Sequence, residues 1–399
     1  MPRNVDKKIK IAFIFGTRPE SIKMYPVIQE VKKYPRWIEP IIILTAQHRE
    51  MLDQMINLFQ IRSKIDLGIM EHGQTLSQIN SSSLLKLEEV FKKIQPDLVL
   101  VQGDTTTTFS GALAAFYQKI KVGHIEAGLR TFKKYYPFPE EINRRLTTVL
   151  ADYHFTPTPL AAKILEKEGI VRENIFITGN TVIDTLLLMQ EDEFHFMDSR
   201  INKLIDQKKQ IILITIHRRE NWGEPLAKVC QALIEIQRKH KNAVILFPIH
   251  KNPIIRKVVT KYLQDKENII LLEPLDYREM ANLMALSTII LTDSGGIQEE
   301  APALGKPVLI LRTETERPEV LKIGAAKLVG TNVVTICREV DGLLNNSDYY
   351  QKMVVKKSPY GDGLAAKRII QYLLYQYHFL KHLPKEFPPN ANLLDIRNY

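Results

Sequence analysis

The sequence predicts an α/β protein built from two doubly wound units, each a mostly parallel sheet covered by helices. At 399 residues, the chain is longer than one ordinary domain. Short β-branched runs alternate with longer amphipathic segments, which is the pattern of repeated βαβ units. Strands such as DLVLVQ at residues 97–102 are almost continuously apolar, which indicates burial on both faces and therefore a parallel sheet.

The first series of elements begins with a strand at residues 10–15 and an apolar-periodic helix at about 19–34. The elements expected after them are strands at 41–44, 98–102 and 122–126, a helix at 107–118 and a helix that opens near Pro139. Gly179-Asn180 is then a turn signal, and a polar stretch at 190–200 follows it. We therefore place a domain boundary in this region.

A second series of strands and helices follows the boundary. The expected elements are strands at 211–216, 243–248, 268–272, 289–292 and 308–311 and a helix at 224–239. Residues 361–377 have apolar side chains at helical spacing, and the proline-rich and asparagine-rich residues after them predict an irregular tail. The predicted division is 1–180 and 181–360 for two Rossmann-like domains, 361–377 for a terminal helix and 378–399 for the tail.

Composition excludes several classes of protein. Hydrophobic residues make up 45% of the chain and charged residues 25%, as in ordinary globular proteins. The apolar runs are shorter than the roughly 20 residues that span a bilayer, so neither a membrane segment nor a secretory signal is predicted. Cys230 and Cys337 are far apart and no CxxC occurs, which argues against disulfides and structural zinc and favours a cytoplasmic location.

The net charge of +10 is compatible with nucleic acid, a membrane surface or a small polyanionic substrate as partner. The lysines occur as scattered pairs, without the interleaved aromatic residues of a single-strand binding surface. The pattern therefore favours a small polyanion over nucleic acid.

The distinctive motifs fall at carboxyl ends of predicted strands, where doubly wound folds bind ligands in a cleft. In GTRPESIK, Gly16 ends a strand, Pro19 suits a first helical turn, and Arg18 and Lys23 flank the helix N-terminus. This arrangement predicts an anion pocket. Because the motif is neither a Walker sequence nor GxGxxG, a P-loop or dinucleotide site is disfavoured. The alternative is an ordinary turn with surface cations.

A second anion site is predicted at TDSGGIQEE. Here a strand ends at Asp293-Ser294, and Gly295 and Gly296 let a phosphate approach the amides of the next helix. That helix contains Glu299 and Glu300, and a carboxylate about a turn and a half along it is placed to accept hydrogen bonds from a ribose diol. Arg317 in TERPE follows near the same edge. The alternative is that Asp293 or Ser294 only caps the helix and that the two glutamates are solvated.

Two histidines end strands of the second series. His217 precedes Arg218 in IHRREN, and His250 ends the strand in FPIHKNP. No carboxylate or cysteine stands at ligand spacing beside either, so contacts with a diphosphate or hydroxyl are favoured over a metal site. A polar residue at a helix N-terminus is the plainer explanation for each.

Acidic residues gather in the first series. Asp104 in QGDTTTT and Glu126 in HIEAGLRT each end a strand, and Glu140 with Glu141 opens a helix nearby. Convergence of such carboxylates raises pKa values and supplies acids and bases. The alternatives are an N-cap for Asp104, a salt bridge from Glu126 to Arg130 or Arg144, and helix-dipole pairing for the glutamates.

Taken in order, these motifs resemble the non-hydrolysing UDP-N-acetylglucosamine 2-epimerases. The resemblance covers about residues 10–377 and is carried by FGTRPE, QGDTTT, HIEAGLRT, PEEINRR, FITGNTVIDTL, HRREN, LTDSGGIQEEAP, LGKPVL and TERPE. It implies the GT-B architecture, two Rossmann-like doubly wound domains with a central cleft. It also implies a homodimer and a terminal helix that packs back on the N-terminal domain.

The family resemblance implies interconversion of UDP-GlcNAc and UDP-ManNAc for cell-surface polysaccharide synthesis. In family chemistry UDP leaves to give 2-acetamidoglucal and is added back, so no cofactor or metal is expected. The implied catalytic residues are Asp104, Glu126, Glu140 and His217. Those implied to bind UDP are Arg18, Lys23, His250, Ser294, Gly295, Gly296, Glu300 and Arg317.

Two other enzyme classes stay open at this point. A GT-B glycosyltransferase would share the Ser294-Gly295-Gly296 pocket but would need an acceptor site. A hydrolysing epimerase would release free ManNAc, and the GDTTT and EAGLRT motifs favour the non-hydrolysing group. A sugar-nucleotide-binding protein without catalysis fits poorly with an intact acid/base set.

Many bacterial family members are activated by UDP-GlcNAc at a second site. By resemblance that site corresponds to Gln47, His48, Gln74 and Arg218, with His250 and Glu140 shared. This chain departs from the family pattern, because Gly73 replaces an arginine and Glu50 replaces a glutamine. Loss of a guanidinium and gain of a carboxylate weaken a pocket for a diphosphate, so we expect weak or absent activation.

Overall fold

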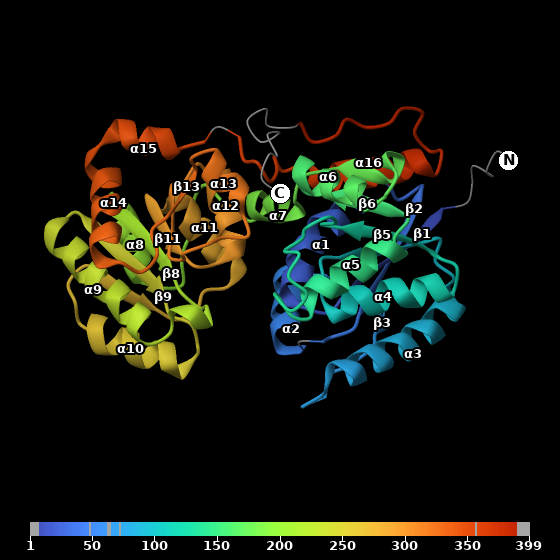
Figure 1. Ribbon diagram of the computed structural model, residues 1–399, viewed down its shortest axis with the longest axis horizontal. Helices are drawn as coiled ribbons and strands as arrows, with labels where there is room; N and C mark the ends of the chain where they lie inside the picture. Colours follow the sequence, from blue (N-terminus) through green and yellow to red (C-terminus); the bar gives the residue numbers. More distant parts are fainter. Residues whose placement is uncertain (1–7, 48, 62–64, 72, 356, 389–399) are drawn as a thin grey trace. The chain divides into compact units, whose positions relative to one another are not determined.

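The computed structural model describes residues 8–47, 49–61, 65–71, 73–355 and 357–388. It divides the chain into two compact units. Unit 1 comprises Met1–Thr185 and Tyr360–Tyr399, and unit 2 comprises Leu186–Pro359. The chain therefore leaves unit 1 once and returns to it for its last segment (Figure 1).

Unit 1 is built on a seven-stranded parallel sheet with the order β3-β2-β1-β4-β5-β6-β7. Its strands are β1 (Ile9–Phe15), β2 (Ile38–Leu44), β3 (Ile65–Asp66), β4 (Leu98–Gln102), β5 (Lys121–Ile125), β6 (Tyr153–Thr156) and β7 (Ile175–Ile177). Its helices are α1 (Arg18–Val31), α2 (Arg49–Leu58), α3 (Leu76–Ile94), α4 (Thr106–Tyr117), α5 (Glu140–Leu150), α6 (Pro159–Lys167), the short η1 (Arg172–Asn174) and α16 (Ala365–Gln376); α7 (Thr181–Leu188) crosses the boundary to unit 2.

Unit 2 repeats this design with a six-stranded parallel sheet in the order β10-β9-β8-β11-β12-β13. Its strands are β8 (Gln210–Thr215), β9 (Ala243–Pro248), β10 (Ile269–Leu272), β11 (Ile289–Thr292), β12 (Val308–Ile310) and β13 (Ala326–Leu328). Its helices are α8 (Ser199–Asp206), η2 (Arg219–Asn221), α9 (Glu224–Lys239), α10 (Pro253–Leu263), α11 (Tyr277–Leu286), α12 (Gly295–Ala303), α13 (Pro318–Lys322), α14 (Val333–Asn345) and α15 (Ser347–Met353).

Both sheets are buried on two faces, as their apolar strands require. In unit 2 one face packs against α9, α10 and α14 through a single large apolar cluster, and α11, α12 and α13 lie on the other side (Figure 1). In unit 1, α3 and α4 cover one face through residues such as Leu87 and Phe91. In each sheet the chain adds strands first on one side of its first strand and then on the other. The loops after β1 and β4, and after β8 and β11, therefore lie at the topological switch points where such folds bind ligands.

The predicted fold class, two doubly wound α/β units, is confirmed. Strands β4, β9 and β11 and helix α9 have the expected bounds, and most other predicted elements differ by a few residues. The terminal helix begins at Ala365 rather than at residue 361. Helix α3 and the elements within residues 153–177, which are β6, α6, η1 and β7, are among those that the sequence did not predict. The division between the units falls after Thr185, whereas the predicted boundary is after residue 180. The Thr185 hydroxyl donates to the Ile22 carbonyl (2.6 Å), a contact within unit 1.

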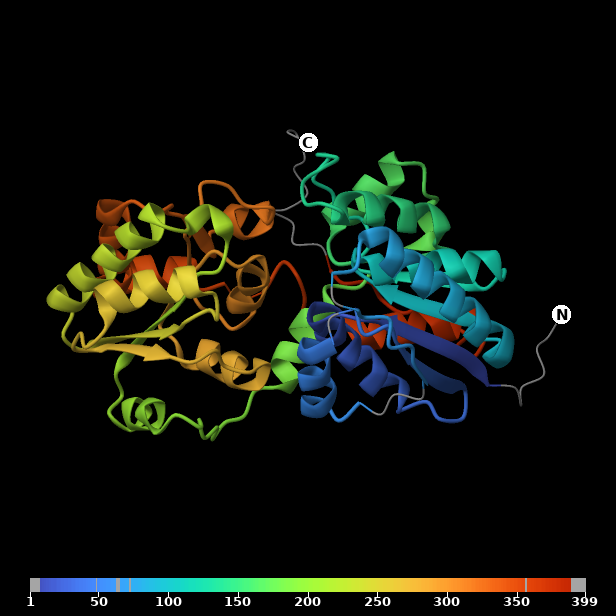
Figure 2. The same ribbon diagram turned by 90° about the horizontal axis from the view of Figure 1, so that it is seen from below.

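The terminal helix α16 packs on unit 1 through Tyr372. The Tyr372 ring stacks on Phe176 at a centroid distance of 4.5 Å and meets Phe155 edge-on at 5.6 Å. The Asp184 carboxylate accepts from the amides of Ala365 and Ala366 (3.2 and 2.8 Å) and so caps this helix. Figure 2 shows α16, in red, within the same unit as β1.

The described part of the tail is not free of contacts. The Phe387 amide donates to the Ile177 carbonyl (2.8 Å), and the Ile177 amide donates to Glu386 (3.0 Å). Arg172 forms an ion pair with Glu386 at 2.7 Å. The tail therefore covers the edge strand β7, which would otherwise offer unpaired backbone groups.

No helix in the described ranges is long and apolar enough to cross a membrane.

The cap of α16 generates a prediction about pH. Burial raises the pKa of Asp184 from its ordinary value of 3.8 to about 7. Between these values the folded protein holds a proton that the unfolded chain has lost, so stability falls as pH rises. Because each pKa unit is worth about 1.4 kcal/mol, titration of Asp184 should lower the free energy of unfolding by roughly 2 kcal/mol between pH 5 and pH 7.

Asp184→Asn cannot ionise, and urea unfolding of this variant should therefore depend less on pH over that range than unfolding of the wild type. An identical pH dependence in the two proteins would show that Asp184 does not titrate there.

Candidate active site

Glu126 lies directly after β5, and side chains from three other segments donate to its carboxylate. Lys23 Nζ and Asn180 Nδ2 lie 2.5 and 3.0 Å from Oε1, and Gln102 Nε2 lies 2.6 Å from Oε2. The carboxylate is 7% exposed. Glu126 also has φ of +67°, a conformation that a non-glycine residue adopts only when its surroundings fix it. One ion pair and two further hydrogen bonds thus hold this nearly buried carboxylate in place.

Asp104 follows β4, and its carboxylate pairs with Arg144 of α5. Burial raises the pKa of Asp104, and the negative charge of Glu126 adds to this, while Arg144 and Lys23 oppose it. The cap of α4 is Thr105, whose hydroxyl accepts from the Thr108 amide (3.1 Å). The capping role considered for Asp104 is therefore wrong, because Thr105 caps the helix and Asp104 pairs with Arg144 instead.

Glu20, which the sequence analysis did not single out, joins the β1 and β4 loops. Its buried carboxylate accepts from the amides of Gly16 and Thr17 (2.9 and 2.8 Å) and from the hydroxyls of Thr105 and Thr108 (2.5 and 3.1 Å). The capping box of α1, with Thr17 three residues before Glu20, was the signal that could have found it. Glu20 fixes the turn that carries Arg18 relative to Asp104.

Arg18 is the first residue of α1 and is half-buried. Within the described ranges its guanidinium has no hydrogen-bond partner, whereas Lys23 is paired with Glu126. A cation at a helix N-terminus suits an anion, which the amides there also favour.

The two glutamates at the start of α5 differ. Glu141 is fully buried and accepts from the amides of Thr131 and Phe132 (3.0 and 3.1 Å), so it anchors the preceding loop. Glu140 is half-buried, and no such bond from it is found within the described ranges. Glu140 is therefore the glutamate of this pair that a ligand can reach.

A buried histidine, His124, is hydrogen-bonded to the loop that carries Asp104. His124 Nε2 lies 2.7 Å from the Gly103 carbonyl, and burial lowers the pKa of His124 to about 3. The imidazole is therefore neutral and donates from Nε2. Gly103 has φ of +75°, which permits the turn that presents Asp104.

In unit 2, Asp293 organises the ends of β8 and β11. This fully buried carboxylate accepts from the amides of His217 and Arg218 (3.1 and 3.0 Å) and from Asn221 Nδ2 (2.8 Å). His217 Nδ1 lies 3.0 Å from Oδ1. Burial alone would raise the pKa of Asp293, but the hydrogen bonds from His217 and Asn221 outweigh it and lower this pKa. The capping role considered for Asp293 is wrong.

This pairing orients the His217 ring. Because Nδ1 donates to Asp293, the opposite nitrogen, Nε2, is left to meet a ligand. His250 lies nearby with its ring centroid 6.5 Å from that of His217, and its Nδ1 accepts from the Asn252 amide (3.1 Å). Partial burial and the neighbouring His217 lower the pKa of His250.

The start of α12 has the features of an anion site. Ser294 is its N-cap residue, but the Ser294 hydroxyl makes no capping hydrogen bond. Gly295 and Gly296 have no side chains to cover the first amides of the helix. Glu300 is buried behind Gly296 and accepts from the Tyr277 hydroxyl (2.6 Å), so it is not the solvated glutamate considered from the sequence.

Two arginines flank this helix start. Arg317 forms an ion pair with the buried Glu299, and Arg218 Nε donates to the Asp293 carbonyl (3.0 Å) while Nη1 meets Glu316 at 3.4 Å. Burial opposes ionisation of Glu316, yet Arg312 and Arg218 lower the pKa of Glu316 to about 2. Arg317 is therefore held by the buried Glu299, and Arg218 by the half-buried Glu316 and the Asp293 carbonyl.

The residues expected to form a regulatory site are distributed over both units. Gln47 Oε1 accepts from the Thr107 hydroxyl (2.9 Å), and Gln74 is bonded within its own loop, to the Ile69 carbonyl (2.8 Å) and the Glu71 amide (3.0 Å). Arg218 belongs to the anion site of unit 2. His48 lies outside the described residues. The expected weak activation stays a prediction.

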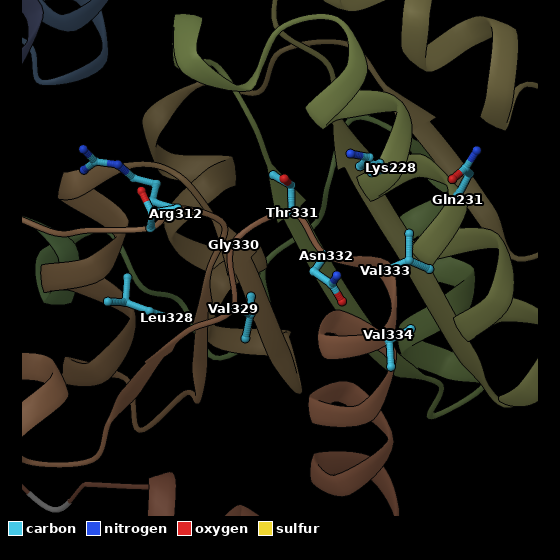
Figure 3. Close-up of a pocket in the computed structure, with 11 residues that line it drawn as sticks. Lys228, Gln231, Arg312, Leu328, Val329, Gly330, Thr331, Asn332, Val333 and Val334 are labelled. Atoms are coloured by element: carbon cyan, nitrogen blue, oxygen red, sulfur yellow. The ribbon is translucent and has the colours of Figure 1, made fainter.

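A pocket of about 610 Å³ lies elsewhere in unit 2, and none of the candidate residues lines it. Figure 3 shows Lys228 and Gln231 on one side, Arg312 on the other and the loop at Gly330–Asn332 between them. Within the described ranges, no group of His, Cys, Asp or Glu side chains could hold a metal ion.

Two Rossmann-like units, one with neighbouring carboxylates after β4 and β5 and one with uncovered amides at the start of α12, give the chain a GT-B-like architecture. The chain belongs to the UDP-N-acetylglucosamine 2-epimerase family, whose model matches residues 29–374.

Several relatives and solved structures support this assignment. The UDP-N-acetylglucosamine 2-epimerase of Bacillus subtilis is 48% identical over 96% of this chain and 99% of its own length. The crystal structure of the Neisseria meningitidis UDP-GlcNAc 2-epimerase bound to UDP-GlcNAc matches with a TM-score of 0.81 and 46% identity, over 92% of this chain and all of that chain. The Methanocaldococcus jannaschii enzyme in complex with UDP-GlcNAc and UDP matches at 0.73 and 34%, with the same coverage.

The Asp293 pairing predicts a defined tautomer for His217. In Asp293→Asn, the remaining oxygen should stay where Arg218 and Asn221 donate, so the new amide group faces His217 Nδ1 and donates to it. Nitrogen-15 NMR of the histidine rings should show the proton on Nδ1 in the wild type and on Nε2 in the variant. A proton that stays on Nδ1 in both proteins would contradict this pairing.

Proposed function

We propose that the chain is a non-hydrolysing epimerase that interconverts UDP-GlcNAc and UDP-ManNAc. The observation that carries the proposal is the Glu126 carboxylate, held by Lys23, Gln102 and Asn180 close to the charge of Asp104. Inversion at C2 requires removal of a proton on one face and delivery on the other, and a carboxylate pair with unequal environments suits both tasks. Family membership supports the same reaction.

Unit 2 supplies the groups that would bind UDP. The uncovered amides of α12, the Ser294 hydroxyl and Arg317 suit the diphosphate, and Glu300 suits the ribose hydroxyls. His217 presents Nε2 to the same ligand, and His250 lies beside it. From unit 1, Arg18 and Lys23 contribute positive charge.

The chemistry then follows in two balanced steps. A base takes the C2 proton while the C1–O bond breaks, so that UDP leaves with the bonding pair and 2-acetamidoglucal remains. UDP then adds back at C1 as an acid delivers a proton to the other face of C2. Asp104, Glu126, Glu140 and His217 are the proposed acid and base groups, and the diphosphate clamp stabilises the leaving charge. The reaction needs neither a metal nor a nicotinamide.

Cell-surface polysaccharide synthesis is the proposed use of the product, and the proposed assembly is a homodimer. An apolar surface on α3, α4 and α5 supports the dimer. Its exposed residues are Leu85, Phe116, Tyr117, Leu146 and Val149. α3 packs against α4 and α4 against α5 within one unit, so we propose that a second copy packs on this part of unit 1.

The product assay tests the proposed reaction directly. Protein incubated in heavy water with UDP-GlcNAc and EDTA should form UDP-ManNAc with deuterium at C2, as followed by proton NMR. Free ManNAc would indicate a hydrolysing enzyme, and dependence on a divalent ion would contradict the metal-free mechanism.

Substitutions in unit 1 should affect turnover, whereas a substitution in unit 2 should affect UDP binding. Asp104→Asn and Glu126→Gln should each lower kcat by a factor on the order of 10² and leave UDP affinity nearly unchanged, because these groups act on protons. Arg317→Ala should instead weaken UDP binding by about 1.5–3 kcal/mol, because a charged contact is lost. Steady-state kinetics and calorimetry measure the two effects. Near-normal turnover of either carboxylate variant would remove that residue from the mechanism.

The proposed dimer predicts a change of mass in a surface variant. Val149 is 79% exposed on α5, and Val149→Glu would bury a charge if a second copy covered it. Sedimentation velocity should show a dimer for the wild type and mostly monomer for the variant. A wild-type monomer would overturn the assembly.

A further inference from the structure

The FITGNTVIDTL motif contains an asparagine to which no role has yet been given. Asn180 lies between β7 and α7 and is 3% exposed. Its Nδ2 donates to Glu126 Oε1 (3.0 Å), and its Oδ1 accepts from the Val182 amide (3.1 Å). Since the Val182 amide can only donate, the oxygen of the Asn180 amide must face it and the NH₂ group must face Glu126.

The returning chain fixes Asn180 from the other side. The Asn180 amide donates to the Tyr360 carbonyl at 2.6 Å. Gly179 and Gly361 allow this approach, because a Cβ on Gly179 would stand 3.3 Å from Gly361 Cα and one on Gly361 would stand 3.2 Å from Ile183. The side chain that meets Glu126 is therefore held where the chain re-enters unit 1.

The charges around Glu126 explain why a neutral donor suits this position. Lys23 forms an ion pair with Glu126, and Asp104 is a neighbouring group of like charge. His124, which is neutral, also lies near Glu126. A second cation would over-stabilise the carboxylate, which must exchange protons. An amide adds a hydrogen bond to Oε1 without adding charge.

We propose that Asn180 is a positioning residue that sets the orientation and proton affinity of Glu126. The inference rests on the proposed function, because it assigns Asn180 to the acid/base step of that reaction. Asn180 acts only through Glu126.

The test uses Asn180→Ala and Asn180→Asp in the full-length protein. Loss of the donor disfavours the charged form of Glu126, and the aspartate adds a like charge. The limb of the pH–rate profile that depends on Glu126 should therefore move to higher pH, further in Asn180→Asp. At neutral pH kcat should fall about tenfold or more, with UDP affinity unchanged.

Arg368→Gln is the matched control. Arg368 Nη1 donates to the Thr178 carbonyl (3.1 Å) in the same turn but does not meet Glu126 in the contacts described. This variant should lower stability without moving the pH–rate profile. Equal kinetic behaviour of Asn180→Ala and Arg368→Gln would reduce Asn180 to a structural residue and overturn the proposal.

A second readout needs no turnover. Infrared difference spectra against Glu126→Gln follow ionisation of the Glu126 carboxylate in the ligand-free protein, and its midpoint should rise in Asn180→Ala. An unchanged midpoint overturns the inference even if the wild type is active. A wild type that forms no UDP-ManNAc, combined with a shifted midpoint, would overturn the proposed function and leave the positioning of Glu126 supported.

Discussion

The structure of unit 1 depends on one requirement, which is that the nearly buried charge of Glu126 must be compensated. An uncompensated carboxylate in this position would cost several kcal/mol. Lys23 comes from α1, Gln102 from the end of β4 and Asn180 from the turn before α7, so compensation brings together segments that are far apart in the sequence. Two further features accompany this arrangement: Glu126 has a left-handed backbone, and the Asn180 amide donates to the Tyr360 carbonyl. Folding of the returning chain is thereby linked to the proposed chemistry.

Unit 2 meets a similar requirement with different partners. Asp293 also lies at a switch point, but it is compensated by backbone amides, Asn221 and His217 rather than by a lysine. Such a carboxylate stays charged and serves to orient the groups around it, as its lowered pKa indicates. Asp104 has the opposite behaviour, with burial and a neighbouring charge raising its pKa. The two units share the order of their first six strands, unit 1 adding β7, and they differ in how their carboxylates are paired. This difference is in keeping with the proposed division between proton transfer in unit 1 and UDP binding in unit 2.

Much of this could be predicted from the sequence, because strands that are buried on both faces have an unmistakable pattern and their carboxyl ends follow directly. Asp104, Glu126, His217 and Ser294 were found in this way, and each lies at the predicted strand end. The partners could not be found by that reasoning. Glu20 meets Thr105 across 85 residues and Asn180 meets Glu126 across 54, and no local pattern specifies such pairs. The difference between Glu140 and Glu141 depends on which side of α5 faces the loop at Thr131, which a helix start alone does not determine. The pairing of Phe387 with β7 was missed because the tail has no periodicity.

The central claim is that the C1–O bond of the nucleotide sugar breaks and re-forms while carboxylates of unit 1 exchange the C2 proton. Positional isotope exchange tests it most directly. UDP-GlcNAc labelled with oxygen-18 in the bridge between C1 and the β-phosphorus is incubated with the protein and recovered. Free rotation of the released β-phosphate should move the label into non-bridging positions, detectable by phosphorus-31 NMR. If the label stays in the bridge while UDP-ManNAc accumulates, the bond never breaks and the account is wrong.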